Sequence, residues 1–258
     1  MGDVTSKDGT TIVFDELGDG PPVVLVSGGS VDRSSNAPLA DQLAKDFTVF
    51  NYDRRGRGPS GDTQPYAVQR EVEDIEAVIG AAGGSAALYG SSSGAALALE
   101  AAIAGAPITK LALWEPPYIL SGRPHPPTDT AKIYRDFVAA GRRGDAVEFF
   151  MSKVVGLPDE FVAGARSSPW WPAQEALAHT LAFDAEIMAD YSLPTKRAAK
   201  VTIPTLIVDG AASFGFMAET ADAMAHAMPN AERRTLEGQS HDVSAEVLGP
   251  VLKEFFAS

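Results

Sequence analysis

The sequence predicts a three-layer α/β/α sandwich, in which a mostly parallel β-sheet lies between two layers of helices. Short, almost continuous apolar runs recur along the chain, as in strands that are buried on both faces of a parallel sheet. Helical patterns separate most of these runs, and parallel strands need such crossover connections. The 258 residues, 45% of them hydrophobic, are enough to bury the core of one domain of this kind.

The predicted strands begin near the N-terminus. Residues 11–18 alternate loosely between polar and apolar until Gly-Asp-Gly-Pro-Pro interrupts the pattern. The run Val23-Val-Leu-Val26 follows, so we expect an outer antiparallel pair and then a buried strand. Further strands are predicted at residues 47–52, 86–89, 111–114, 205–208 and, more weakly, 233–236.

Two helices show the clearest periodicity. In the first, apolar side chains recur at helical spacing at Val68, Val72, Ile75 and Ile79. In the second, which forms the last turns of the chain, they stand at Val247, Leu248, Val251, Leu252, Phe255 and Phe256. Each pattern predicts a helix with one apolar face toward the sheet.

One long stretch breaks the alternation of strands and helices. From residue 116 to 203 helical patterns continue, for example at residues 133–138 and 146–155, without a convincing strand. Prolines mark both ends of the stretch. We therefore predict a core domain of residues 1–115 and 204–258, with residues 116–203 inserted as a helical cap.

Charge and composition exclude several classes of function. The net charge of −13 repels phosphate backbones and anionic lipids, so neither nucleic acid nor a membrane is expected as a partner. The absence of cysteine excludes thiol nucleophiles and thiolate metal sites. No apolar run approaches the roughly 18 residues that span a bilayer, and the N-terminus lacks the layout of a signal peptide, so a cytoplasmic protein is expected. No metal-binding motif is present, and we expect neither a metal nor a cofactor.

A serine-rich turn is the strongest sign of chemistry. Gly90-Ser91-Ser92-Ser93-Gly94 matches G-x-S-x-G between a predicted strand and a predicted helix, which is the context that this motif requires. The sharp turn strains its central residue and leaves no room for side chains two positions away, so both flanks favour glycine. We predict Ser92 as a nucleophile at the carboxyl end of the sheet. The alternative interpretation is a serine-rich loop that caps a helix.

Two amides are predicted to form an oxyanion hole beside this turn. The amide of Ser93 stands at a helix N-terminus and is free to bind a developing negative charge. The second amide is assigned to Gly29, which follows the strand 23–26, with Gly28 as the adjacent alternative.

The base is predicted to be His241. It lies in a loop between the last weak strand and the final helix, from which an imidazole can reach over the sheet to Ser92. The other histidines, His125, His179 and His226, are assigned structural or surface roles.

These features together resemble the α/β-hydrolase fold over essentially the whole chain. The resemblance is carried by Asp53-Arg-Arg-Gly-Arg-Gly-Pro-Ser60, by the serine elbow and by the late His241. It implies an eight-stranded, mostly parallel sheet and the chain order nucleophile, acid, histidine. The family usually has His-Gly before the oxyanion residue, whereas this chain has Ser27-Gly28.

A glycine-rich stretch within the same region offers a competing interpretation. Gly56-Arg-Gly-Pro-Ser-Gly61 matches the dinucleotide-binding pattern G-x-G-x-x-G and follows a predicted strand. Pro59 and Pro65, however, prevent a helix from opening directly after the glycines, and the pyrophosphate needs that helix end. A turn braced by arginines explains the stretch better.

The third member of a catalytic triad is less evident. The resemblance places an aspartate several residues past the strand 205–208, but Ser213 stands there. Glu115 and Asp209 each end a predicted strand and are the candidate acids. Some members of the fold carry the acid after the earlier strand, and likeness to zearalenone-type lactone hydrolases, with a glutamate in this place, favours Glu115. Asp242 is disfavoured because adjacent side chains generally point apart.

The sequence therefore predicts a serine hydrolase that cleaves a carboxylic ester or lactone of a small apolar molecule through an acyl-enzyme. Cap residues Trp171, Tyr118 and Met188 are predicted to line the substrate pocket, with simple packing as the alternative. Two other functions stay open: a cofactor-independent perhydrolase, haloperoxidase-like or carbon–carbon lyase enzyme on the same fold, and a non-catalytic protein that binds a small ligand. A homodimer is also left open.

Overall fold

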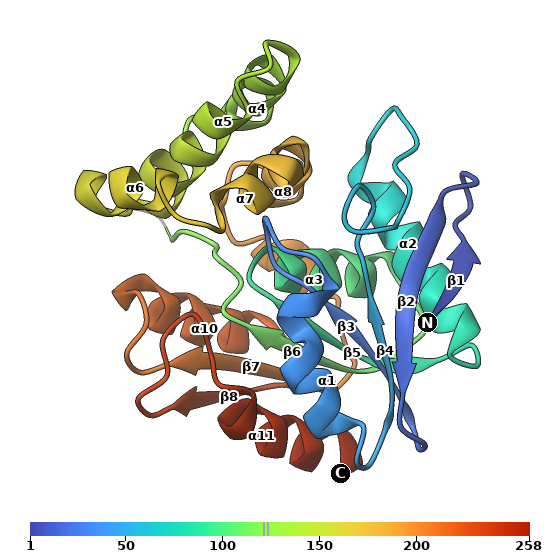
Figure 1. Cartoon of the computed structure of the whole chain (residues 1–258). Coiled ribbons are helices and arrows are strands. Elements are labelled where there is room, and N and C mark those ends of the chain that lie inside the picture. Colours follow the sequence, from blue (N-terminus) through green and yellow to red (C-terminus); the bar gives the residue numbers. More distant parts are fainter. Residues whose placement is uncertain (121, 123) are drawn as a thin grey trace.

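The computed structural model describes residues 1–120, 122 and 124–258, and its centre is an eight-stranded sheet (Figure 1). The strand order is β1-β2-β4-β3-β5-β6-β7-β8. β1 pairs antiparallel with β2, and β2 pairs antiparallel with β4; all the other pairs are parallel. The strands are β1 (Gly2–Thr5), β2 (Thr11–Leu17), β3 (Pro22–Val26), β4 (Thr48–Tyr52), β5 (Ala86–Ser91), β6 (Ile108–Trp114), β7 (Thr205–Gly210) and β8 (Ala231–Leu236). The predicted fold class is confirmed.

Helices cover both faces of this sheet because its inner strands are apolar on both sides. Along β3, Val24 and Val26 face one apolar cluster, whereas Val23 and Leu25 face another, as the two-residue period of a strand requires. The first cluster includes α2 (Val68–Ala81), α3 (Ser93–Ala104) and α10 (Gly215–Ala227). The second includes α1 (Ala37–Leu43) and α11 (Ala245–Ala257). These five helices form the two outer layers of the predicted sandwich.

The chain between β6 and β7 is helical over much of its length and lies beyond one end of the sheet (Figure 1). Its α-helices are α4 (Thr130–Ala139), α5 (Arg143–Phe149), α6 (Asp159–Arg166), α7 (Trp171–Leu177), α8 (Leu181–Met188) and α9 (Thr195–Ala198). A separate apolar cluster, with Tyr134, Val147 and Leu181 among its members, packs α4, α5, α7 and α8 together. We call residues 116–203 the cap segment; its bounds as a domain stay a prediction.

The cap segment departs from its predicted helices at one place. The pattern at residues 146–155 predicts one helix, but α5 ends at Phe149 and a π-helical turn, η2 (Phe150–Val155), follows. Such wider turns often occur next to functional sites. Across the residues that the structure describes, no helix is long and apolar enough to cross a bilayer.

Candidate active site

The serine elbow adopts the strained turn that its glycines predict. Ser92 lies between β5 and α3 with φ 55° and ψ −124°, a conformation that costs free energy for any residue with a side chain. A Cβ atom at Gly90 would overlap the backbone of Gly94 and Ala95, and one at Gly94 would overlap the carbonyl oxygens of Val26 and Ser27. The elbow therefore depends on glycine at both flanks, because the turn brings β3, β5 and α3 into direct backbone contact.

This close packing predicts a large effect of one methyl group. Gly94→Ala is expected to lower the free energy of unfolding by about 3 kcal/mol, since only backbone lies in the way and backbone cannot rotate aside. Denaturant unfolding measures the change. The matched control is Gly80→Ala in α2, where nothing lies within 4 Å of the new Cβ atom. This control is expected to gain about 0.5–1 kcal/mol from better helix propensity. Equal effects of the two substitutions on the free energy of unfolding would contradict the close backbone packing at Gly94.

A continuous chain of hydrogen bonds joins the three predicted triad residues. The imidazole of His241 has its Nε2 3.1 Å from Ser92 Oγ and its Nδ1 2.6 Å from Glu115 Oε2. Ser92 comes from the elbow, Glu115 follows β6, and His241 lies in the loop between β8 and α11. With the Nδ1 proton directed to Glu115, Nε2 is free to accept the hydroxyl proton of Ser92. This arrangement can activate Ser92 as a nucleophile.

Glu115 is held by contacts on both of its oxygens. The side chain is buried, Oε1 accepts a hydrogen bond from the Gly210 amide at 2.8 Å, and Oε2 accepts one from Ser213 Oγ at 2.7 Å. Ser213 occupies the place where the resemblance expected an aspartate, and here it supplies a hydroxyl to the carboxylate from the neighbouring strand. These contacts fix the carboxylate in the orientation that meets His241.

The other two candidate acids lie elsewhere. Asp209 is fully buried, but both of its oxygens accept hydrogen bonds from Arg233, at 2.9 and 3.0 Å, and from Thr235 on β8. Asp242 is exposed on the wall of the cavity described below. Of the three, only Glu115 contacts the imidazole of His241.

Two aromatic residues that the sequence analysis missed position the histidine loop. Trp114 is fully buried, and its Nε1 donates a hydrogen bond to the carbonyl oxygen of His241 at 2.9 Å. The ring of Phe214 stands edge-on to the imidazole, with 6.0 Å between ring centroids. Trp114 directly precedes Glu115, so one strand end holds both the backbone and the ring of His241. The sequence signal for this, a tryptophan before a strand-end glutamate, is too short to be specific.

The predicted oxyanion donors lie beside the nucleophile. Ser93 is the first residue of α3, so its amide has no acceptor within the helix. The Gly29 amide donates no hydrogen bond to any residue that the structure describes, and the same holds for Gly28. All three residues line one cavity with Ser92. A Cβ atom at Gly28 would lie 3.2 Å from Ser92 Cβ, so the loop passes directly against the nucleophile.

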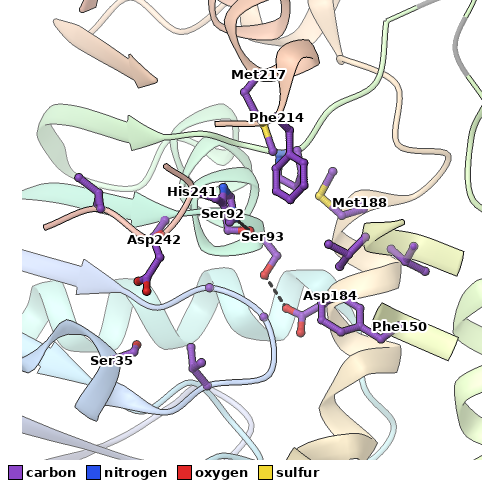
Figure 2. A pocket seen from close by; sticks show the side chains of 18 of the residues that line it. Ser35, Ser92, Ser93, Phe150, Asp184, Met188, Phe214, Met217, His241 and Asp242 are labelled. Carbon is purple, nitrogen blue, oxygen red and sulfur yellow. Dashed lines mark hydrogen bonds between the residues drawn. The ribbon is translucent and has the colours of Figure 1, made fainter. Parts of the chain in front are cut away.

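The cavity has a volume of about 1010 Å³, and Ser92 and His241 are among the residues that line it. Figure 2 shows Ser35 and Asp242 on one side and Phe150 and Met188 on the other, with Ser92 and His241 between them. The cap-segment side chains that line the cavity are mostly apolar and include Ile119, Phe150, Met151, Val154 and Met188, and Met217 of α10 adds to them. The opposite wall carries more polar side chains, among them Ser35, Asn36, Asp242 and Ser244.

Only one of the three predicted pocket residues lies in this cavity. Met188 lines it. Trp171 is instead buried in the apolar cluster of the cap segment, where its Nε1 donates a hydrogen bond to Glu175, and Tyr118 is buried in the main core. The aromatic side chains in the cavity lining are instead Tyr89, Phe150, Tyr191, Phe214 and Phe216, of which Phe150 and Tyr191 come from the cap segment.

The remaining histidines contact backbone or other side chains. His125 lines the cavity, with its Nδ1 2.7 Å from the carbonyl oxygen of Asp190. His226 is exposed on α10, and His179 follows α7 beside Phe183. Among the described residues, no group of three histidine, aspartate or glutamate side chains could hold a metal ion.

The arginines after β4 form buried ion pairs, as a braced turn predicts. Arg54 pairs with Glu71 and Asp184, Arg55 with Asp74 and Asp8, and Arg57 with Asp184. All three arginine side chains are almost fully buried. Arg57 also donates hydrogen bonds to the carbonyl oxygens of Gly28 and Val31, so the turn supports the loop that carries the predicted Gly29 donor.

Comparison with known proteins agrees with this architecture. An alpha/beta hydrolase from Sphaerobacter thermophilus DSM 20745 is 52% identical, and the match covers 99% of this chain and 100% of that one with a TM-score of 0.93. An esterase from Exiguobacterium antarcticum shares the fold over 100% of both chains, with a TM-score of 0.77 at 20% identity. The uncharacterized hydrolase YraK of Bacillus subtilis (strain 168) is 33% identical over 99 residues, which span 37% of this chain and 36% of that relative's length. The family model of the alpha/beta hydrolase family matches residues 23–247, and this chain belongs to that family.

Proposed function

We propose that this protein is a serine hydrolase that cleaves a carboxylic ester or lactone through an acyl-enzyme. The observation that carries the proposal is the hydrogen-bonded chain from Ser92 through His241 to Glu115. Its position at the carboxyl ends of the central strands, on the floor of a large cavity, supports a site that binds and cleaves a small molecule.

The proposed mechanism has two halves. In the first, His241 takes the hydroxyl proton as Ser92 attacks the carbonyl carbon, and Glu115 stabilises the imidazolium that forms. The amides of Ser93 and Gly29 bind the oxyanion, and the alcohol leaves with the proton from His241. In the second half, His241 activates a water molecule that releases the acid and restores Ser92. In a lactone the leaving alcohol stays attached to the acyl group, so the same steps open a ring.

The shape and lining of the cavity support an apolar substrate with two sizeable parts. Because the cavity extends on both sides of Ser92, both the acyl part and the alcohol part have room. The apolar wall of the cap segment suits a hydrocarbon or aromatic ring, while the polar wall near Ser35 and Asp242 suits a part that carries hydroxyl groups. Large-ring lactones and bulky aryl esters are the proposed substrate class.

A fluorophosphonate probe tests whether Ser92 is a nucleophile. We expect one covalent adduct, on Ser92, and none in Ser92→Ala. Peptide mapping of the labelled protein locates the adduct. A protein that stays unlabelled while folded would contradict the proposal and favour a ligand-binding function.

Turnover distinguishes hydrolysis from other chemistry at the same residues. We expect release of acid from aryl esters and large-ring lactones in water, measured by titration of the acid at constant pH. Labelling of Ser92 without turnover on these substrates would favour carbon–carbon bond cleavage. Turnover that requires hydrogen peroxide in place of water would favour a perhydrolase.

A further inference from the structure

The cap segment places a buried carboxylate beside the nucleophile elbow. Asp184 lies on α8, and its Oδ1 accepts a hydrogen bond from Ser93 Oγ at 2.8 Å (Figure 2). Arg54 donates to the same oxygen at 2.8 Å, and Arg57 donates to both carboxylate oxygens at 2.9 and 3.0 Å. The triad does not use Asp184, although this carboxylate lines the same cavity as Ser92.

The charges around Asp184 balance, and the carboxylate is ionised. Arg54 also forms two hydrogen bonds to Glu71, at 2.7 and 2.9 Å, so two guanidinium groups face two carboxylates. Burial raises the pKa of Asp184, but Arg57, Arg54 and the Ser93 hydrogen bond outweigh burial and hold that pKa below its usual value. By its charge alone, an ionised carboxylate this near the oxyanion hole opposes the formation of an oxyanion. We therefore expect Asp184 to contribute to the site through its position and not through its charge.

Asp184 contacts both sides of the proposed oxyanion hole. On one side it holds the hydroxyl of Ser93, whose amide is one donor. On the other side, a Cβ atom at Gly29 would lie 3.2 Å from Asp184 Oδ2, so the carboxylate lies directly against the second donor. Arg57 completes the connection, because it binds Asp184 and also the carbonyl oxygens of Gly28 and Val31.

We propose that Asp184 is a positioning residue that sets the spacing of the two oxyanion donors, through the Ser93 hydroxyl on one side and Arg57 on the other. This proposal rests on the proposed serine hydrolase function. Because Asp184 belongs to α8, it also makes the geometry of the oxyanion hole depend on the placement of the cap segment.

The variant Asp184→Asn distinguishes a positioning role of Asp184 from an electrostatic one. Removing the negative charge leaves the local balance more positive, so a purely electrostatic role predicts a higher kcat. A positioning role predicts the opposite: kcat falls by about 10- to 100-fold, while KM changes by less than about threefold, because the loss falls on the transition state.

A second variant keeps the test valid if Asp184→Asn does not fold. Ser93→Ala removes the hydroxyl, which donates to Asp184 and accepts from Arg54 at 3.4 Å, and it leaves both arginine pairs of Asp184 in place. We expect kcat to fall by about 10-fold. The control is Glu100→Gln, which breaks another ion pair between the cap segment and α3, that of Arg197 with Glu100, at 2.6 and 2.8 Å. Glu100 lies outside the cavity, and its variant should keep kcat within about twofold of the unchanged protein.

A pair of inhibitors reports on the oxyanion hole directly. A trifluoromethyl ketone adds to Ser92 and places an oxyanion in the hole, whereas the matching methyl ketone binds without forming one. In both variants the affinity for the trifluoromethyl ketone should fall by the same factor as kcat/KM, and the affinity for the methyl ketone should stay unchanged.

The outcomes that overturn the positioning role differ from those that overturn the function. If the unchanged protein hydrolyses esters but both variants keep its kcat and its inhibitor affinities, Asp184 does not position the hole. A parallel loss of affinity for both ketones also overturns the proposal, because it indicates a general loss of structure. If the protein without substitutions neither hydrolyses esters nor binds the trifluoromethyl ketone, this result contradicts the proposed function itself.

Discussion

Ser92→Ala and His241→Ala are each expected to lower kcat by about four to six orders of magnitude, because nucleophile and base act as one unit. Without the hydroxyl no acyl-enzyme forms, and without the imidazole the hydroxyl keeps its proton at neutral pH. Initial rates of aryl ester hydrolysis measure the loss.

The double variant Ser92→Ala/His241→Ala gives a sharper check. It should be about as inactive as either single variant, since removing one partner already abolishes the function of the other. His226→Ala serves as the matched histidine control, because that side chain is exposed on α10 and does not line the cavity. If Ser92→Ala kept activity within about 100-fold of the unchanged protein while the fold was intact, Ser92 would not be the nucleophile.

Glu115→Gln is expected to lower kcat by about three to four orders of magnitude, whereas Asp209→Asn should have a far smaller effect. Glutamine keeps the volume of the buried side chain, but a neutral amide neither stabilises the imidazolium nor selects the Nδ1 proton of His241. Asparagine at position 209 instead weakens a structural pair with Arg233 and should lower the free energy of unfolding by about 1–3 kcal/mol.

Kinetics and unfolding together decide between these two carboxylates. Glu115→Gln should show its main effect in kcat, and Asp209→Asn its main effect in the denaturant midpoint. If the two variants exchange these effects, Asp209 is the acid of the triad and Glu115 is a structural residue at the end of its strand.

The sheet and the serine elbow could be predicted because their determinants are local in sequence. Apolar runs at Val23–Val26 and 205–208 need only neighbouring residues to be recognised as strands buried on both faces. The motif of the elbow likewise spans only five residues, and the collision that requires Gly90 is with Gly94 and Ala95 of the same turn, whereas the one that requires Gly94 is with Val26 and Ser27 at the end of β3. The periodicity at residues 146–155 predicts a helix, but it does not distinguish α5 from the π-helical turn that continues it.

The residues by themselves leave both Glu115 and Asp209 open as the acid, because both end neighbouring parallel strands, and only the resemblance favours Glu115. Trp114 pairs with Val208, so the two carboxylates follow at equivalent positions on β6 and β7. Which of them turns toward His241 depends on partners from elsewhere: Arg233 and Thr235 on β8 hold Asp209, while Gly210 and Ser213 hold Glu115. No local pattern contains this information.

The sequence by itself determined the fold class and predicted Ser92 and His241 as a pair, since these inferences depend on short motifs and on the order of elements along the chain. Tertiary structure alone decided which carboxylate meets His241, which cap side chains line the cavity, and that Asp184 contacts Ser93 across 91 positions of sequence. Those outcomes depend on the direction of buried side chains between distant elements. The orientation of a buried side chain depends on the whole folded chain, because apolar surface must be buried and buried charges must be paired in the same packing.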